Sequence, residues 1–395
     1  MILKSDDETS NLIDKYNLYE NILKKMLLFA GVWPRKNSSV VYRFLMCVHG
    51  LGSFLMLFAI TKFCLEHITN LHLFLTGLGL GLGFVTIIQK MICLAIYRDN
   101  LFELHGTLAY TFAKDYNNAE MQPILMSPLL SFYRPSQIMM GISWTIMALY
   151  WSVPLVFILI QLAEGENSIK YLLPFPTSFP WPVTVNKWVY AGLYIFEVYA
   201  STCLVVFTVA VDSLFGFFIF QISGQLRTLS HRIRNVGSGA NHREELIECI
   251  SRHQTLTQCQ RSLGRIYGPI VLWLSVASAM VLCALIYQAA HLSPKKAVIV
   301  VLYLFIKGIQ TLFYGWSGTT LSIENDNFRE AVYSSDWAGS GEKTLMTNIL
   351  MLLIYNKPFV LKACSVTTIS VDLFITVSNT AISYYFMLRT LEKAQ

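Results

Sequence analysis

Long apolar stretches separated by polar segments dominate the chain. Stretches of about 20 mostly apolar residues are long enough to cross a bilayer as helices. Such stretches predict an all-α, polytopic membrane protein with seven transmembrane helices. The fourth is longer than a crossing needs, so we expect its helix to tilt or to continue past the membrane. The predicted spans are 41–62, 71–97, 138–162, 188–220, 268–290, 298–321 and 366–388.

The composition agrees with a membrane protein. Hydrophobic residues make up 54% of the 395 residues and charged residues only 14%, whereas soluble domains have about 25% charged residues. So little charge cannot cover a water-facing surface, which excludes a soluble enzyme, a disordered chain and a nucleic-acid-binding protein. The sequence contains no catalytic motif, and its eight cysteines show no metal-binding spacing. We therefore expect no enzymatic activity, no cofactor and no metal site.

The basic residues predict an orientation. Twenty of the 30 Lys and Arg residues lie on the side of the N-terminus and only seven on the other side, with three inside spans. Basic residues concentrate on the cytosolic side of membrane proteins, so we expect a cytosolic N-terminus and an extracellular C-terminus. The cytosolic side would hold 1–40, 98–137, 221–267 and 322–365, and the outer side 62–70, 163–187, 291–297 and the tail 389–395.

The segments between the spans have patterns of their own. An amphipathic helix is predicted over 11–30, within the N-terminal segment 1–40, and it ends at Gly31. Residues 221–267 have helical periodicity on both sides of a Gly-Ser-Gly-Ala break, so the flanking spans are expected to extend into the cytosol. The apolar run from 345 to 354 predicts a short inner helix before the last span. The proline-rich loop 163–187 is either a folded lid over the outer mouth or a plain connector.

Charged side chains inside the membrane are costly and suggest functional roles. Glu197 and Lys307 both lie roughly 13–14 Å from the outer ends of their spans at ~1.5 Å per residue. Equal depth permits an ion pair facing the bundle interior, and the alternative is that each faces water or a carbonyl separately. Asp212 lies near the inner boundary of its span, where we expect it to be solvated.

Aromatic residues crowd the outer halves of the third and fourth spans. An apolar pocket with a few hydroxyl groups suits a small ligand with little charge. The alternative is an aromatic belt at the membrane interface combined with core packing. The aromatic candidates for ligand contact are Tyr150, Trp151, Phe157, Tyr190 and Tyr194.

The last span is unusually polar for a helix that faces lipid. Thr376, Thr380, Tyr384 and Leu388 recur every four residues and form one stripe along it. Such a stripe can line a water-filled pore that narrows at an apolar ring. Packing between helices through small polar residues is the alternative.

Several motifs, in this order and spacing, resemble those of the insect odorant receptor family. The similarity covers nearly the whole chain. It includes a Gly-x-Trp-Pro before the first span, a Cys-Ile…His stretch before the fifth, and the link and final helix near the end of the chain. The matching segments are 29–34, Leu246–His253 with Cys249 and Ile250, 314–318 with Ala331, Tyr333 and Trp337, Lys357-Pro358, and 370–388.

The resemblance implies a function. Family members are four-subunit, ligand-gated, non-selective cation channels in the plasma membrane of olfactory sensory neurons. In them an odour-tuning subunit associates with a shared co-receptor. This chain lacks the longer second inner loop of the co-receptor, which indicates a tuning subunit that binds a small volatile hydrophobic ligand. Residues 221–267 would form the anchor between subunits.

The resemblance also implies site residues. The ligand would sit in an outer pocket among spans two, three, four and six, which adds Phe74, Leu78, Met147 and Tyr303 to the aromatic residues, Glu197 and Lys307. In the last span, Leu388 falls at the apolar constriction of the pore, with Leu391 as its companion.

Three other functions compete with the channel. A G-protein-coupled receptor would use the basic 221–267 loop to contact a G protein, but it would have the opposite orientation. A gustatory-type chemoreceptor channel would show Gln-Phe after the Tyr of its last span, which is absent after Ser383-Tyr384. A transporter would use Glu197 and Lys307 as a coupling pair, but no inverted repeat is visible.

Overall fold

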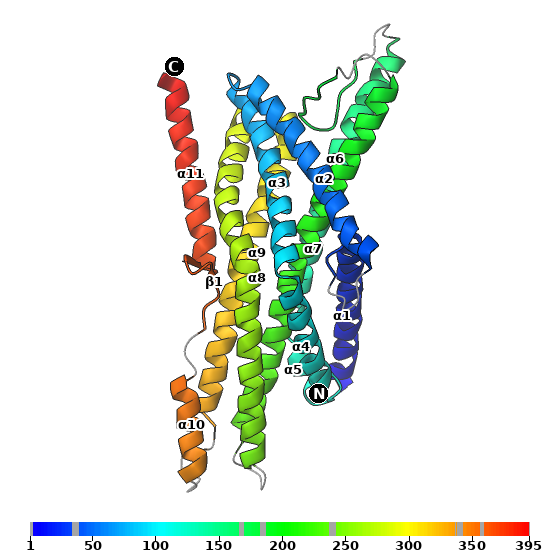
Figure 1. Cartoon of the computed structure of the whole chain (residues 1–395). Coiled ribbons are helices and arrows are strands. Elements are labelled where there is room, and N and C mark those ends of the chain that lie inside the picture. Colours follow the sequence, from blue (N-terminus) through cyan, green and yellow to red (C-terminus); the bar gives the residue numbers. More distant parts are fainter. Residues whose placement is uncertain are drawn as a thin grey trace.

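The computed structural model describes residues 3–33, 39–165, 170–181, 187–236, 242–335, 337, 343–355 and 359–394. In this part of the chain, seven helices are long and apolar enough to cross a membrane, which confirms the all-α, seven-span prediction (Figure 1). The elements are α1 (Leu3–Phe29), α2 (Val40–Glu66), α3 (Leu71–Ile96), α4 (Arg98–Tyr116), α5 (Gln122–Met126), α6 (Leu129–Ala163), α7 (Lys187–Arg234), α8 (His242–His291), α9 (Pro294–Tyr333), α10 (Lys343–Tyr355), β1 (Lys362–Ala363), β2 (Thr367–Thr368) and α11 (Val371–Ala394).

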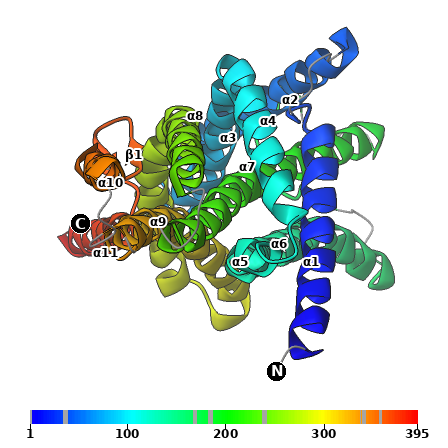
Figure 2. The same ribbon diagram turned by 90° about the horizontal axis from the view of Figure 1, so that it is seen from below.

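Helix α7 is the centre of the molecule. It contacts α9, α6 and α8 extensively and also packs against α1 to α5, and Figure 2 shows these helices arranged around it. Within its most apolar stretch, 94% of the residues are buried inside the protein. Helix α11, by contrast, stands at one edge and packs mainly on α8 and α9. The two ends of the chain lie toward opposite ends of the bundle (Figure 1).

The N-terminal helix α1 packs on the bundle through one apolar face. Tyr19, Leu23 and Leu27 are almost fully buried, and their spacing places them on one side of the helix. The helix ends where Gly31 adopts a φ of +72°, and the amide of Val32 donates to the carbonyl of Leu27 at 2.9 Å. A residue with positive φ just after a helix is usually glycine, because a side chain there is strained.

Three membrane helices continue well beyond the predicted spans. Helix α7 runs on to Arg234, α8 begins at His242, and α9 extends to Tyr333. The segment 221–267 is therefore helical on both sides of its break, while the break itself at 237–240 lies outside the described residues. The predicted loop 98–137 instead contains α4, α5 and the start of α6.

A short hairpin precedes α11, so the prediction that the last helix begins at 366 is wrong. The antiparallel strands β1 and β2 are joined by a turn in which Cys364 and Ser365 have positive φ. The turn closes through a 3.0 Å hydrogen bond from the amide of Val366 to the carbonyl of Ala363. Helix α11 starts only at Val371, whose amide donates to the hydroxyl of Thr319 on α9 at 3.0 Å.

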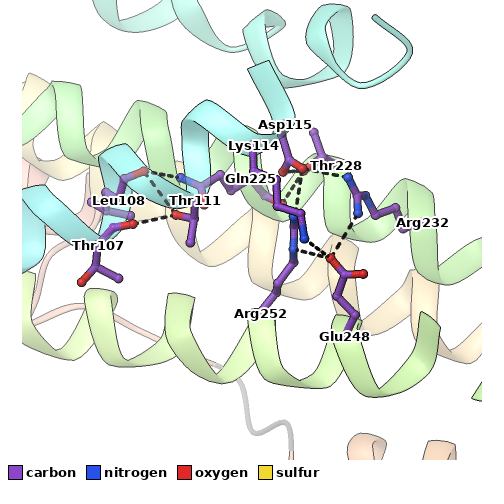
Figure 3. Close-up of polar contacts among 10 residues, drawn as sticks. All are labelled: Thr107, Leu108, Thr111, Lys114, Asp115, Gln225, Thr228, Arg232, Glu248 and Arg252. Carbon is purple, nitrogen blue, oxygen red and sulfur yellow. Dashed lines mark hydrogen bonds and ion pairs between the residues drawn. The ribbon is translucent and has the colours of Figure 1, made fainter. Parts of the chain in front are cut away.

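A buried carboxylate holds the inner ends of three helices together (Figure 3). Asp115 on α4 is 1% exposed and pairs with Arg232 of α7 at 2.8 Å and Arg252 of α8 at 2.7 Å. The hydroxyl of Thr228 also donates to it at 2.9 Å. Removing an ion from water is costly, and these partners offset that cost. The cluster joins α4, α7 and α8 at the end of the bundle that the basic residues assign to the cytosol.

Candidate ligand cavity

A cavity lies among α3, α6, α7 and α9. These helices are spans two, three, four and six, the four expected to surround a ligand. The lining residues are Gly83 and Thr86 of α3; Met139, Ser143, Ile146 and Met147 of α6; Leu204, Val205, Thr208, Val209 and Asp212 of α7; and Tyr303, Ile306, Lys307 and Gln310 of α9.

Helical spacing explains how these residues meet. On each helix the lining positions recur three or four residues apart, so they share one face. On α3 the missing side chain of Gly83 leaves room. A Cβ there would come only into ordinary contact with Leu204 at 3.7 Å and with the hydroxyl of Tyr303 at 3.9 Å. The walls are therefore mostly apolar, and a glycine widens one of them.

One side of the cavity carries a buried ion pair. The ammonium of Lys90 lies 2.5 Å from Asp212 Oδ1, and their side chains are 0% and 2% exposed. The Tyr314 hydroxyl donates to the same oxygen at 2.5 Å, and the Gln310 amide donates to Oδ2 at 2.5 Å. The prediction that Asp212 is solvated is wrong, because the surrounding helices enclose α7 at this depth.

Of the two alternatives for Glu197 and Lys307, the ion pair does not form, and each residue has separate partners. Glu197 accepts hydrogen bonds from the amide of Phe175 at 3.0 Å and the hydroxyl of Thr177 at 2.5 Å. Lys307 instead donates to Gln310 Oε1 at 3.0 Å. Lys307 lines the cavity beside Leu204 to Asp212 of α7, inward of Glu197 on that helix, so the equal depth expected from residue counting does not hold. The outer loop 170–181 supplies the partners of Glu197 instead.

The aromatic candidates hold the outer loop and neighbouring helices in place. Tyr150 stacks on Phe175 with ring centroids 5.3 Å apart, and Tyr190 donates to the carbonyl of Leu172 at 3.0 Å. Trp151 Nε1 donates to Ser201 at 2.9 Å, and its carbonyl accepts from Tyr194 at 2.7 Å. These side chains form a layer outside the cavity and do not line it.

The remaining predicted ligand contacts divide into two groups. Met147, Tyr303 and Lys307 line the cavity. Phe74 and Leu78 instead pack toward α8, against a small cluster that includes Tyr287, and Phe157 is a half-buried residue of α6.

Lys90, Asp212 and Gln310 were not predicted to be parts of the site. The signal that could have found them is a second pair of charges inside spans, one on α3 and one on α7. Both lie toward the inner ends of their spans, and this position led us to expect a solvated Asp212. The enclosure of α7 could not be inferred from their positions along the chain.

Helix α11 presents its polar stripe away from most of its own chain. Thr376 is exposed, Tyr384 is 49% exposed and Thr380 is half-buried. The hydroxyl groups of Thr376 and Thr380 donate back to helix carbonyls four residues earlier, at 2.8 and 2.7 Å. Leu388 is partly buried against the apolar cluster of α8 and α11, and the side chain of Leu391 lies outside the described part of the structure.

Comparisons with known proteins agree on one family. The model of the family described as 7tm Odorant receptor matches residues 70–382. Among relatives from Drosophila melanogaster, Odorant receptor 13a is 25% identical over 277 residues, covering 64% of this chain and 65% of that protein. Odorant receptor 9a is 23% identical and covers 60% of each chain. The chain thus spans somewhat less than two thirds of the length of these two relatives.

The fold is also similar to solved structures. The insect olfactory receptor OR5 from Machilis hrabei superposes with a TM-score of 0.75 at 16% identity, covering 95% of this chain and 99% of that one. The same receptor in complex with eugenol gives a TM-score of 0.76 at 14% identity, covering 96% and 100%.

Proposed function

Because the chain belongs to the 7tm odorant receptor family, we propose that it is the odour-binding subunit of a ligand-gated, non-selective cation channel. The observation that carries the proposal is the cavity among α3, α6, α7 and α9. Its mostly apolar walls and few polar groups suit a small volatile molecule. The structure of the Machilis hrabei receptor in complex with eugenol shows that a receptor of this fold takes a ligand of that size.

The proposal extends to the assembly and its pore. The chain would join a shared co-receptor in a heterotetramer in the plasma membrane of olfactory sensory neurons, with its N-terminus in the cytosol. Thr376, Thr380 and Tyr384 would face the central pore, with Leu388 and Leu391 near its constriction. In support of this, Thr376 and Tyr384 are exposed on the single chain. An odorant would then open the pore through a higher affinity for the open state than for the closed one.

Current recordings test the proposal directly. We expect odour-evoked cation current in cells that express the chain with a co-receptor, and no current in cells that express the chain alone. The current should persist in excised patches without nucleotides, because a channel gated by its ligand needs no G protein. An epitope at the C-terminus should be labelled on intact cells.

The competing G-protein-coupled receptor predicts the reverse. It requires cytosolic GTP for any response and hides a C-terminal epitope inside the cell. Either result would reject the channel proposal.

A cavity-filling variant tests whether this cavity is the ligand site. Gly83→Val is expected to raise the odorant concentration for half-maximal current at least about tenfold, since its added methyl groups occupy space between Leu204 and Tyr303. One tenfold change corresponds to about 1.4 kcal/mol of binding free energy. Dose–response curves measure the effect.

The matched control is Gly79→Val, one helical turn earlier on α3. A Cβ at Gly79 meets nothing within 4 Å, and Gly79 does not line the cavity. Its dose–response curve should resemble that of the wild type. Equal sensitivity in Gly83→Val and wild type, with normal surface expression, would place the ligand elsewhere.

A further inference from the structure

The charges at the cavity do not cancel. Lys90, Asp212 and Lys307 are the charged residues at or directly behind its wall among those described. Lys90 and Asp212 form the ion pair described above, so one positive charge remains, that of Lys307. Burying an unpaired charge is costly, and the described residues place no carboxylate within 4.0 Å of the Lys307 ammonium.

The carboxylate of Asp212 has little capacity left for Lys307. Three donors already occupy its two oxygens: Lys90, Tyr314 and Gln310. A carboxylate offers about four lone-pair positions. The Gln310 amide therefore acts as a bridge, because its Nε2 donates to Asp212 and its Oε1 accepts from Lys307 at 3.0 Å. This bridge orients the lysine at the cavity wall.

The Lys307 ammonium keeps hydrogen-bonding capacity toward the cavity. It has three N–H donors, and Gln310 is the only hydrogen-bond acceptor within reach among the described residues. The ring of Tyr303 lies 5.9 Å from the ammonium and adds a weaker cation–π contact. Lys307 is half-buried rather than buried, although it lies far from either end of α9. Lys307 is one of the residues that line the cavity.

We propose that Lys307 binds the ligand through an acceptor oxygen, so that the cavity selects an apolar chain bearing a carbonyl or carboxylate group. This inference rests on the proposed function, because it assigns a ligand class to the same cavity. The oxygen accepts a charge-assisted hydrogen bond from Lys307. The chain lies against Met139, Ile146, Met147 and Leu204. An amine of equal length is excluded, because its ammonium repels Lys307 and offers no acceptor.

A binding assay tests this ligand class without requiring channel activity. The probes are heptanoic acid, heptanal, 1-octene and heptylamine, added to the full-length chain in lipid nanodiscs, with the shift in melting temperature as the readout. We expect the acid and the aldehyde to stabilise the wild-type chain and the amine not to do so. Lys307→Met should weaken acid and aldehyde binding about tenfold to a hundredfold, the range for a hydrogen bond to a charged group. Binding of 1-octene should not weaken.

Two further variants separate the role of the charge from effects on the fold. Lys307→Arg keeps the charge and the donors and should retain acid binding. Lys187→Met makes the same chemical change at the exposed start of α7 and should bind all probes as the wild type does. A larger response to the acid than to the aldehyde identifies a carboxylate as the preferred group, and the reverse identifies a neutral carbonyl.

The outcomes distinguish this inference from the proposed function. Acid binding that Lys307→Met abolishes, in a chain that carries no odour-evoked current, supports the inference and rejects the channel. The inference is overturned if the wild type and Lys307→Met bind the acid with equal affinity. It is also overturned if the wild type binds only 1-octene, only heptylamine, or none of the four probes. The current recordings would then decide the channel proposal independently.

Discussion

Lys90→Met is expected to destabilise the folded chain by about 3–5 kcal/mol, the usual cost of removing one partner of a buried ion pair. The substitution leaves the Asp212 carboxylate enclosed without its cation, since the two side chains are 0% and 2% exposed. The methionine fills nearly the same space as the lysine stem, so the loss of charge dominates the effect. The melting temperature of the purified chain and its surface expression measure it.

A double variant shows whether the pair is responsible. Lys90→Met combined with Asp212→Asn removes both charges, and asparagine still accepts a hydrogen bond from Tyr314. We expect the double variant to be more stable than the single Lys90→Met variant, because no uncompensated charge remains. Losses that simply add would show that Lys90 and Asp212 act independently.

Gly318→Val is expected to prevent the hairpin before α11 from docking and to abolish ligand-evoked current. A Cβ at this position of α9 would collide with the backbone carbonyl of Ile369. The backbone around that carbonyl is held in place, because the amide of Ile369 donates to the carbonyl of Leu361 at 2.8 Å and helix α11 begins two residues later. Overpacking alone costs about 1–3 kcal/mol, and here a rigid backbone group must move. Surface expression and current amplitude together measure the loss.

The same helix provides the control. Gly308 also lies on α9, but a Cβ there meets nothing within 4 Å. Gly308→Val adds the same side chain and should keep normal surface expression. If both variants express and conduct alike, the close approach of the hairpin to α9 is not required for the function of α11.

The number and type of the membrane helices could be predicted from the sequence, because apolar length alone determines whether a helix can span a bilayer. The beginning of α11 could not. Residues 366–370 contain no proline or glycine that would separate them from the span, yet Cys364 and Ser365 adopt positive φ and turn the chain into a hairpin. Neither residue is a glycine or an asparagine, the types that most often adopt positive φ, so the only turn signal was the weak one of a serine.

Neither the relative depth nor the partners of Glu197 and Lys307 could be predicted from the sequence. Lys307 lies near Asp212 of α7, inward of Glu197. Counting residues from the ends of spans does not fix how neighbouring helices are shifted along one another. The loop residues Phe175 and Thr177 donate hydrogen bonds to the carboxylate of Glu197. The conformation of an irregular loop cannot be predicted from periodicity in the sequence. Asp212 was misjudged for a related reason, because its burial comes from neighbours that are distant in the sequence.

The four helices around the cavity were expected only because of the resemblance to a family. Most of the residues that line the cavity were not predicted. Aromatic side chains appeared to be the best ligand contacts, but Tyr150 and Trp151 use their rings and polar atoms to fasten α6 to α7 and the outer loop. The lining depends instead on an absent side chain, that of Gly83. The hydropathy of the sequence does not show where a missing side chain leaves space in the fold.

The enclosure of α7 also governs how the bilayer can act on this protein. Its apolar stretch is 94% buried inside the protein, whereas the corresponding stretches of α2 and α9 are 33% buried and that of the span containing α6 is 22% buried. Changes in bilayer thickness or in acyl-chain order act on the helices that lipid touches, through tilting and mismatch. Because α7 has little contact with lipid, such changes do not act on it directly. The lipid environment would therefore reach the cavity indirectly, through the less enclosed helices α6 and α9 that also line it.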